Sequence, residues 1–259
     1  MLFSRYERYQ YAVSPLFEVI CQLRFPSILK INAGDPVEFQ ERLRQKCPRY
    51  SVHQEQPQAR KADGRTEQLP PILNHTFISE DGTWKVNLTK DFIALSSVRY
   101  TTWEDFAAKL DEVLAMFIQV YQPAFFDRIG LRYVNAFSRK RLQMDELLWD
   151  DLINAPFIGV LGEADIEEAA VSKSALSADV SLPGGLLLHL QCGPGKLSPQ
   201  QASKDEEVKF ILDHDYAVRG NMQAQEVPEK LEGMHHYAVR LFRAAVSDQL
   251  HAAMGPTPL

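Results

Sequence analysis

The sequence predicts an α+β protein built from an internal duplication. Two observations support this: strand-like and helix-like segments follow the same order in both halves, and each half closes with a long amphipathic helix. Antiparallel hairpins with helices at the ends of each run are typical of α+β folds. We therefore expect two β-α-β-β-β-α repeats, residues 1–123 and 124–259, with antiparallel sheets and the long helices packed on one face.

The first repeat is expected to open with a strand from Leu16 to Phe25, because apolar and mostly polar residues alternate along it. A short helix should follow, with Asp35 as N-cap, Pro36 at the first helical position and Glu38 three residues after the cap. Residues 51–71 are rich in Gln, Arg, Lys and Pro and contain hardly any apolar side chain. Such a segment buries too little surface to offset its ordering entropy, so we interpret it as a long mobile loop.

Three strands and a helix should complete the first repeat. The turn Glu80–Gly82 between alternating segments is a hairpin signal. The helix is expected to begin at Thr101, which forms a capping box with Glu104, and to end before Pro123. Its apolar stripe includes Leu110, which we expect to be buried. The three strands are expected at residues 72–79, 84–89 and 91–99.

The second repeat is expected to follow the same order. Its hairpin is predicted around the turn PGG at Pro183–Gly185. The closing helix should begin at Pro228, where a new apolar stripe starts. The remaining expected elements are a strand at Arg128–Phe137, a short helix near Asp145 and strands at Ser174–Leu182, Leu186–Cys192 and Val208–Val218.

Composition narrows the function classes. The formal charge of −6 argues against coating nucleic acid by bulk attraction, although a local basic patch is compatible with it. The three cysteines have no CxxC spacing, which favours a reducing compartment over a disulfide framework. No leader and no stretch of about 20 apolar residues is evident. We therefore expect a cytoplasmic protein with no membrane partner.

No catalytic residue and no cofactor are predicted, because the HExxH, GxSxG and GK[ST] motifs are all missing. Asp213 and Asp215 share one face of a strand and could hold a divalent cation or share acid–base work. Two carboxylates without a third ligand instead favour a structural role, so no metal is expected. His189 and His235 are interpreted as core histidines that hydrogen-bond within the fold.

Three arginines form the candidate ligand-binding site. Arg24, Arg128 and Arg132 should project from the non-core faces of the two opening strands. If those strands lie close together, three guanidinium groups mark one open face, which would suit carboxylates, phosphates or a nucleic-acid backbone. The alternative is that they are solvated arginines paired with Glu18 and Asp127.

Four segments resemble a sporadically distributed family of uncharacterised bacterial proteins of about this length: SPLFEVICQLRF, WKVNLTKDFIALSSVRYTTWEDF, FFDRIGLRYVNAF and FILDHDY. The resemblance covers almost the whole chain, and RIGLRYVN is its most specific stretch. The family has no established activity to carry over. Its patchy occurrence is similar to that of mobile defence and toxin–antitoxin genes, which implies a place in such a system.

Two main function hypotheses follow. The first is a non-enzymatic protein-interaction or regulatory component of a bacterial defence or toxin–antitoxin-like system, with a protein partner. The alternative is a nucleic-acid- or nucleotide-binding protein that uses the arginine-bearing sheet face. Binding that falls steeply with salt would favour the alternative, and salt-tolerant co-purification with one protein would favour the first. A metal-dependent enzyme using Asp213 and Asp215 is the third hypothesis. The sequence carries no signal for an oligomeric state.

Overall fold

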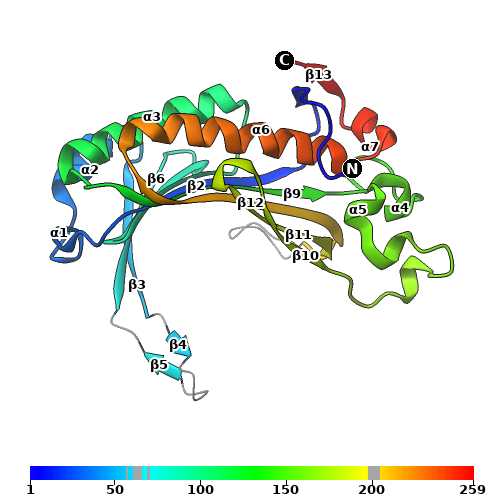
Figure 1. The fold of residues 1–259 in the computed structure, drawn as a ribbon, viewed down its shortest axis with the longest axis horizontal. Helices are drawn as coiled ribbons and strands as arrows, with labels where there is room; N and C mark the ends of the chain where they lie inside the picture. Colours follow the sequence, from blue (N-terminus) through cyan, green and yellow to red (C-terminus); the bar gives the residue numbers. More distant parts are fainter. Residues whose placement is uncertain (57, 61–65, 69–70, 198–204) are drawn as a thin grey trace. The chain divides into compact units, whose positions relative to one another are not determined.

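The fold is α+β, as the sequence predicts, with a nine-stranded main sheet and segregated helices (Figure 1). The strand order is β10-β11-β12-β9-β2-β8-β7-β6-β3, so the opening strands β2 (Leu16–Arg24) and β9 (Phe126–Phe137) are neighbours. The strand pairs β10–β11, β11–β12, β3–β6, β6–β7 and β7–β8 are antiparallel. A computed structural model describes residues 1–56, 58–60, 66–68, 71–197 and 205–259.

The chain divides into two compact units that do not coincide with the predicted repeats. Strands β2, β9 and β12 (Lys209–Met222) each pass from one unit into the other. Each opening strand thus contributes residues to both units. The predicted superposition of residues 1–123 on 124–259 remains a prediction. Unit 1 comprises Met1–Val19, Leu131–Val218 and Pro228–Leu259, and unit 2 comprises Ile20–Gly130 and Arg219–Val227.

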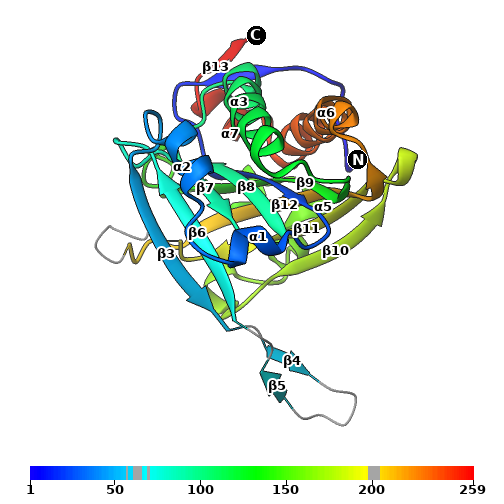
Figure 2. The same cartoon turned by 90° about the vertical axis from the view of Figure 1, so that its left-hand side faces the viewer.

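In unit 2 the helices pack on one face of the strands. Phe117 of α3 lies 4.9 Å from Phe25, and Phe39 of α2 lies 5.5 Å from Phe77, measured between ring centroids. Figure 2 shows α3 and α2 lying over the strands of this unit. The elements are α1 (Leu29–Asn32), α2 (Val37–Leu43), α3 (Trp103–Tyr121), β3 (Arg49–Glu55), β6 (Ile72–Ile78), β7 (Trp84–Leu88) and β8 (Phe92–Ser97).

The predicted mobile loop at residues 51–71 is wrong for the part that the structure describes. Strand β3 pairs with β6 from Arg49 opposite Ile78 to Glu55 opposite Ile72, and β4 (Gln58–Arg60) pairs with β5 (Thr66–Gln68). An edge strand gains backbone hydrogen bonds while its side chains stay largely polar, so composition alone misses it. The remainder of the predicted loop, residues 57, 61–65 and 69–70, lies outside the described residues.

Two predicted helix caps shift by one residue. Helix α2 has Pro36 at its N-cap position and no side-chain cap. Asp35, the expected cap, instead accepts a hydrogen bond from the hydroxyl of Tyr50 at 3.2 Å. Helix α3 is capped by Thr102, whose hydroxyl accepts from the backbone N–H of Asp105 at 3.2 Å. In both cases a neighbouring polar group competes for the local hydrogen bond.

Unit 1 places α6 against its strands, and Phe137 of β9 lies 5.8 Å from Phe242 of α6. The short helix expected near Asp145 begins only at Trp149. The chain's two ends pair, because β1 and β13 form a separate two-stranded sheet. The elements are β1 (Tyr9–Tyr11), β10 (Leu176–Ser181), β11 (Leu187–Gly195), β13 (Pro256–Pro258), α4 (Trp149–Leu152), α5 (Ala155–Ile158), α6 (Val227–Ala245) and α7 (Asp248–Ala253).

A buried polar cluster lies between the strands of unit 1 and α6. The hydroxyl of Tyr133 is hydrogen-bonded to Nδ1 of His235 at 2.9 Å, which confirms that His235 is a core histidine bonded to the sheet. Nδ2 of Asn135 lies 3.2 Å from Nε2 of His214. Burial lowers the pKa of His214 to about 3, so this imidazole is neutral in the folded protein at pH 7.

Candidate anion-binding face

Arg132, in unit 1, is held in a two-pronged ion pair. Its Nε donates to Oδ1 of Asp213 at 2.8 Å, and its Nη2 donates to Oδ2 of the same carboxylate. The sequence left open whether Arg132 is available to a ligand or paired with a carboxylate; it is paired, and the carboxylate that it binds is that of Asp213. The cause is strand order: β12 lies beside β9, so two residues distant in sequence share one sheet face.

Asp213 and Asp215 both lie on the face of β12 opposite buried His214. The carboxylate of Asp213 forms an ion pair with Arg132, which is a structural role. Asp215 stands opposite His189 of β11, and His189 stands opposite Asp179 of β10. Over the described ranges, no group of three or more His, Cys, Asp or Glu side chains could hold a metal ion.

His189 is not the core histidine that the sequence suggests. Its Nδ1 lies 2.6 Å from Oδ1 of Asp179, and nearly half of its side chain is exposed. This polar face of unit 1 therefore sets Asp179, Asp213 and Asp215 against Arg132 and His189. Carboxylates outnumber permanent cations there, so the face does not favour an anion.

Arg24 and Arg128 lie on the polar face of unit 2, which points away from the helices. On β2, Leu23 is buried toward the helices, so Gln22 and Arg24 point the other way. Arg128 donates from Nη1 to Oε1 of Gln22 at 3.2 Å, which places its guanidinium beside this row. Two of the three predicted arginines thus share a face within one unit.

Gly130 makes room for the Arg128 side chain. A Cβ atom at Gly130 would lie 2.3 Å from Nη1 of Arg128 and 2.8 Å from its Cζ. The guanidinium therefore lies directly over Gly130 of its own strand. A planar group held in this way presents a fixed fork of donors.

Two further cations, which the sequence analysis missed, lie on the same polar face. The strand registers place Lys85 opposite both Ser96 and Ile78, and Ile78 opposite Arg49. Directly paired residues in antiparallel strands point to the same side of a sheet. The neighbouring row, Val86, Phe77 and their partners, faces the helices. The predicted hairpin at Glu80–Gly82 could have pointed to Lys85. Arg49 could not be found in the same way, because the edge strand that carries it was not predicted.

Uncharged polar groups lie between these cations. Nδ2 of Asn87 donates to Oδ1 of Asn74 at 2.9 Å and to Oγ1 of Thr76 at 3.0 Å. We call Arg24, Arg49, Lys85 and Arg128 the basic face of unit 2.

The basic face has the chemistry of an anion-binding surface. Neither Arg24 nor Arg49 forms an ion pair with any described residue, and both are exposed. Unneutralised guanidinium groups beside amide and hydroxyl donors suit phosphate or carboxylate oxygens. No bulk positive charge is needed, because Debye screening limits exposed charges to a local effect.

Comparison with known proteins leaves the family open: no family model matches the chain, and no curated protein matches it significantly. Among the described helices, none combines the length and the apolar character that crossing a membrane requires.

Proposed function

We propose that this protein is a nucleic-acid-binding protein whose contact surface is the basic face of unit 2. One observation carries the proposal: four cations share this face with amide and hydroxyl groups, and two of them, Arg24 and Arg49, form no ion pair with any described residue. The polar face of unit 1 serves as an internal contrast, because there Arg132 is neutralised by Asp213.

The geometry favours contacts to phosphates rather than to a small anion. Arg24 and Arg128 lie on neighbouring strands, whereas Lys85 and Arg49 lie on strands farther along the sheet order. Cations spread over several strands match a ligand with repeated charges, such as the sugar–phosphate backbone. The surrounding Asn, Ser and Thr side chains add donors of the kind that contact phosphate and sugar oxygens.

The proposal is tested by fluorescence anisotropy with labelled duplex DNA, single-stranded DNA and RNA over a range of salt concentrations. If all four cations contact phosphates, log K against log[salt] should have a slope of about −3.6 on duplex DNA. Charge reversal in Arg24→Glu should weaken binding at least about tenfold and reduce the slope by about 0.9 or more.

Arg44→Glu is the matched control, since it reverses the same charge at the C-terminal end of α2, on the helix side of unit 2. It should leave affinity within about twofold, because screened charges distant from a contact contribute little. Equal losses in the Arg24 and Arg44 variants would show a non-specific charge effect. Absence of binding at low salt for all three nucleic acids would reject the proposal.

The protein-interaction hypothesis has its own support in the edge strand β3. Within the described residues β3 pairs only with β6, and it exposes Tyr50 and Val52. Such an edge can add a strand from another chain. On this second proposal the protein is a regulatory component of a bacterial defence or toxin–antitoxin-like system, consistent with the family that the sequence resembles.

Affinity purification from a bacterial host at high salt separates the two proposals. A single protein retained by the wild type and lost in Val52→Lys would support strand addition, because a lysine at the edge opposes pairing. Retention by the variant, or salt-sensitive capture of nucleic acid alone, would count against it.

A further inference from the structure

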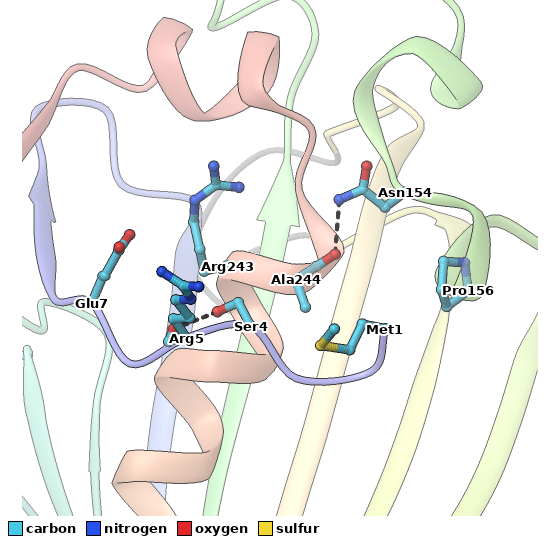
Figure 3. A pocket seen from close by; sticks show the side chains of 8 residues that line it. All are labelled: Met1, Ser4, Arg5, Glu7, Asn154, Pro156, Arg243 and Ala244. Atoms are coloured by element: carbon cyan, nitrogen blue, oxygen red, sulfur yellow. Dashed lines mark hydrogen bonds between the residues drawn. The ribbon is translucent and has the colours of Figure 1, made fainter.

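A pocket of about 400 Å³ lies in unit 1. Its walls come from the N-terminal segment, from the end of α6 and from the start of α5. Figure 3 shows Arg5, Glu7 and Arg243 on one side of the pocket and Asn154 and Pro156 on the other. A volume of this size suits a small molecule.

The N-terminal wall is anchored rather than loosely placed. The backbone N–H of Ser4 donates to the carbonyl of Arg240 at 3.1 Å, and Nε of Arg240 donates back to the carbonyl of Ser4 at 2.9 Å. The Tyr6 ring stacks on His236 with centroids 3.9 Å apart. The residue between them, Arg5, is therefore carried on a fixed stretch of backbone at the pocket.

The last carbonyl groups of the helix end that faces the pocket are hydrogen-bonded by Asn154. The last carbonyl groups of a helix carry partial negative charge. Here Asn154 donates from Nδ2 to the carbonyls of Ala244 at 2.8 Å and Val246 at 2.9 Å, and from its backbone N–H to that of Ala245 at 2.8 Å. The carbonyls are thus satisfied from one side.

The two arginines of the pocket, Arg5 and Arg243, differ in their hydrogen bonds and ion pairs. Arg243 donates from Nη1 to the carbonyl of Val246 at 3.2 Å and from Nη2 to the exposed carboxylate of Asp248, which fixes its orientation and leaves other N–H groups. Arg5 is exposed and makes no ion pair with any residue in the described part of the chain. Glu7 is the pocket's one acidic lining residue, and it accepts from the hydroxyl of Tyr9 at 3.2 Å.

We infer that this pocket binds a small anion that carries a phosphate or a carboxylate group. Arg5 supplies an uncommitted guanidinium, Arg243 supplies a second one already oriented by its protein contacts, and Asn154 shields the anion from the helix carbonyls. An oriented donor loses less entropy on binding, so even a weak site gains from this arrangement. The basic face is in unit 2, so failure of either proposal leaves the other intact.

The test is an NMR titration of the full chain with inorganic phosphate and, separately, with acetate. Wild type should show saturable shifts for residues of the pocket with a dissociation constant below about 5 mM for at least one anion. Preference for phosphate or acetate identifies the group that the site takes. Arg5→Gln should weaken that binding at least about tenfold, since it removes a charge-assisted contact.

Two further variants make the result decisive. Glu7→Gln should tighten binding severalfold, because it removes a like charge next to the anion. Arg44→Gln, the same substitution at the C-cap of α2 in unit 2, should leave anion binding unchanged. The inference is overturned if neither anion produces saturable shifts up to about 20 mM, or if Arg5→Gln binds like the wild type.

Discussion

Arg132 and Asp213 are joined side by side across β9 and β12, with Nε of the arginine 2.8 Å from Oδ1 of the carboxylate. They are 81 residues apart in sequence. The pair removes one arginine from the predicted binding trio and gives Asp213 a structural partner.

A double-mutant cycle should detect this pair. Arg132→Gln and Asp213→Asn are expected to show a coupling free energy of about 1 kcal/mol in urea denaturation, because the geometry is two-pronged but the arginine is nearly half exposed. The coupling should fall as salt is added. The exposed pair Arg44 and Glu41 is the control and should give less than about 0.5 kcal/mol. Equal coupling for both pairs would show that the paired geometry contributes nothing extra.

The apolar stripe of α3 should be essential to stability. Leu110 is 3 % exposed, so Leu110→Ala should lower the free energy of unfolding by about 2–5 kcal/mol through lost burial and a residual cavity. Leu29, which is 73 % exposed, provides the control: Leu29→Ala should change it by no more than about 0.5 kcal/mol. Chemical denaturation measures both, and an unchanged midpoint for Leu110→Ala would contradict the observed packing.

His214 should make stability depend on pH. The folded protein keeps this imidazole neutral, with its pKa lowered by burial to about 3, while the unfolded chain should bind a proton near the ordinary pKa of 6.5. Stability from this group is thus complete above pH 6.5 and is lost as pH falls from 6.5 toward 3, at up to about 1.4 kcal/mol per pH unit.

The His214 effect is isolated by comparison with His214→Gln, which cannot titrate. Urea denaturation of both proteins between pH 7 and pH 4 should give a difference in unfolding free energy that shrinks as the pH falls. Among its neighbours, Asp213 raises the pKa of His214, while Tyr133, Tyr216 and Asn135 surround it without adding charge near neutral pH. A pH-independent difference would mean that the imidazole has the same pKa in the folded and unfolded protein.

Gly130→Ala should separate binding from stability. The new methyl group would overlap the guanidinium of Arg128, which can swing away because it is the end of a flexible side chain. The free energy of unfolding should therefore change by less than about 1 kcal/mol. Nucleic-acid affinity should fall at least about threefold, because Arg128 loses its fixed orientation. Anisotropy and denaturation on the same sample check the two effects, and a loss of stability with intact affinity would contradict this account.

The three cysteines should be inert in the native protein. Cys21, Cys47 and Cys192 are buried, and burial raises the pKa of each thiol, that of Cys192 to about 12. The reactive thiolate is therefore scarce at neutral pH. Ellman's reagent should label none of them within minutes under native conditions and all three in denaturant. Rapid labelling of one thiol in the native protein would reveal local opening at that site.

Local patterns in the sequence were enough to place most elements. The period of two along β2 and β9, and the apolar stripes of α3 and α6, predicted these elements within a few residues. Side-chain periodicity reports which face is buried, whatever the strand or helix packs against. The caps at Asp35 and Thr101 were off by one residue, because nearby groups such as Tyr50 compete for the same hydrogen bonds.

The sequence alone therefore determined the α+β class, the long helices and the faces that carry Arg24, Arg128 and Arg132. Only the tertiary structure decided that Arg132 is paired with a carboxylate, because ion pairing depends on the order and register of strands distant along the chain. In the structure Arg132 pairs with Asp213. Part of the predicted loop belongs to the edge strand β3, which begins at Arg49. Strand pairing is a non-local property, and no periodicity within one segment encodes its neighbour.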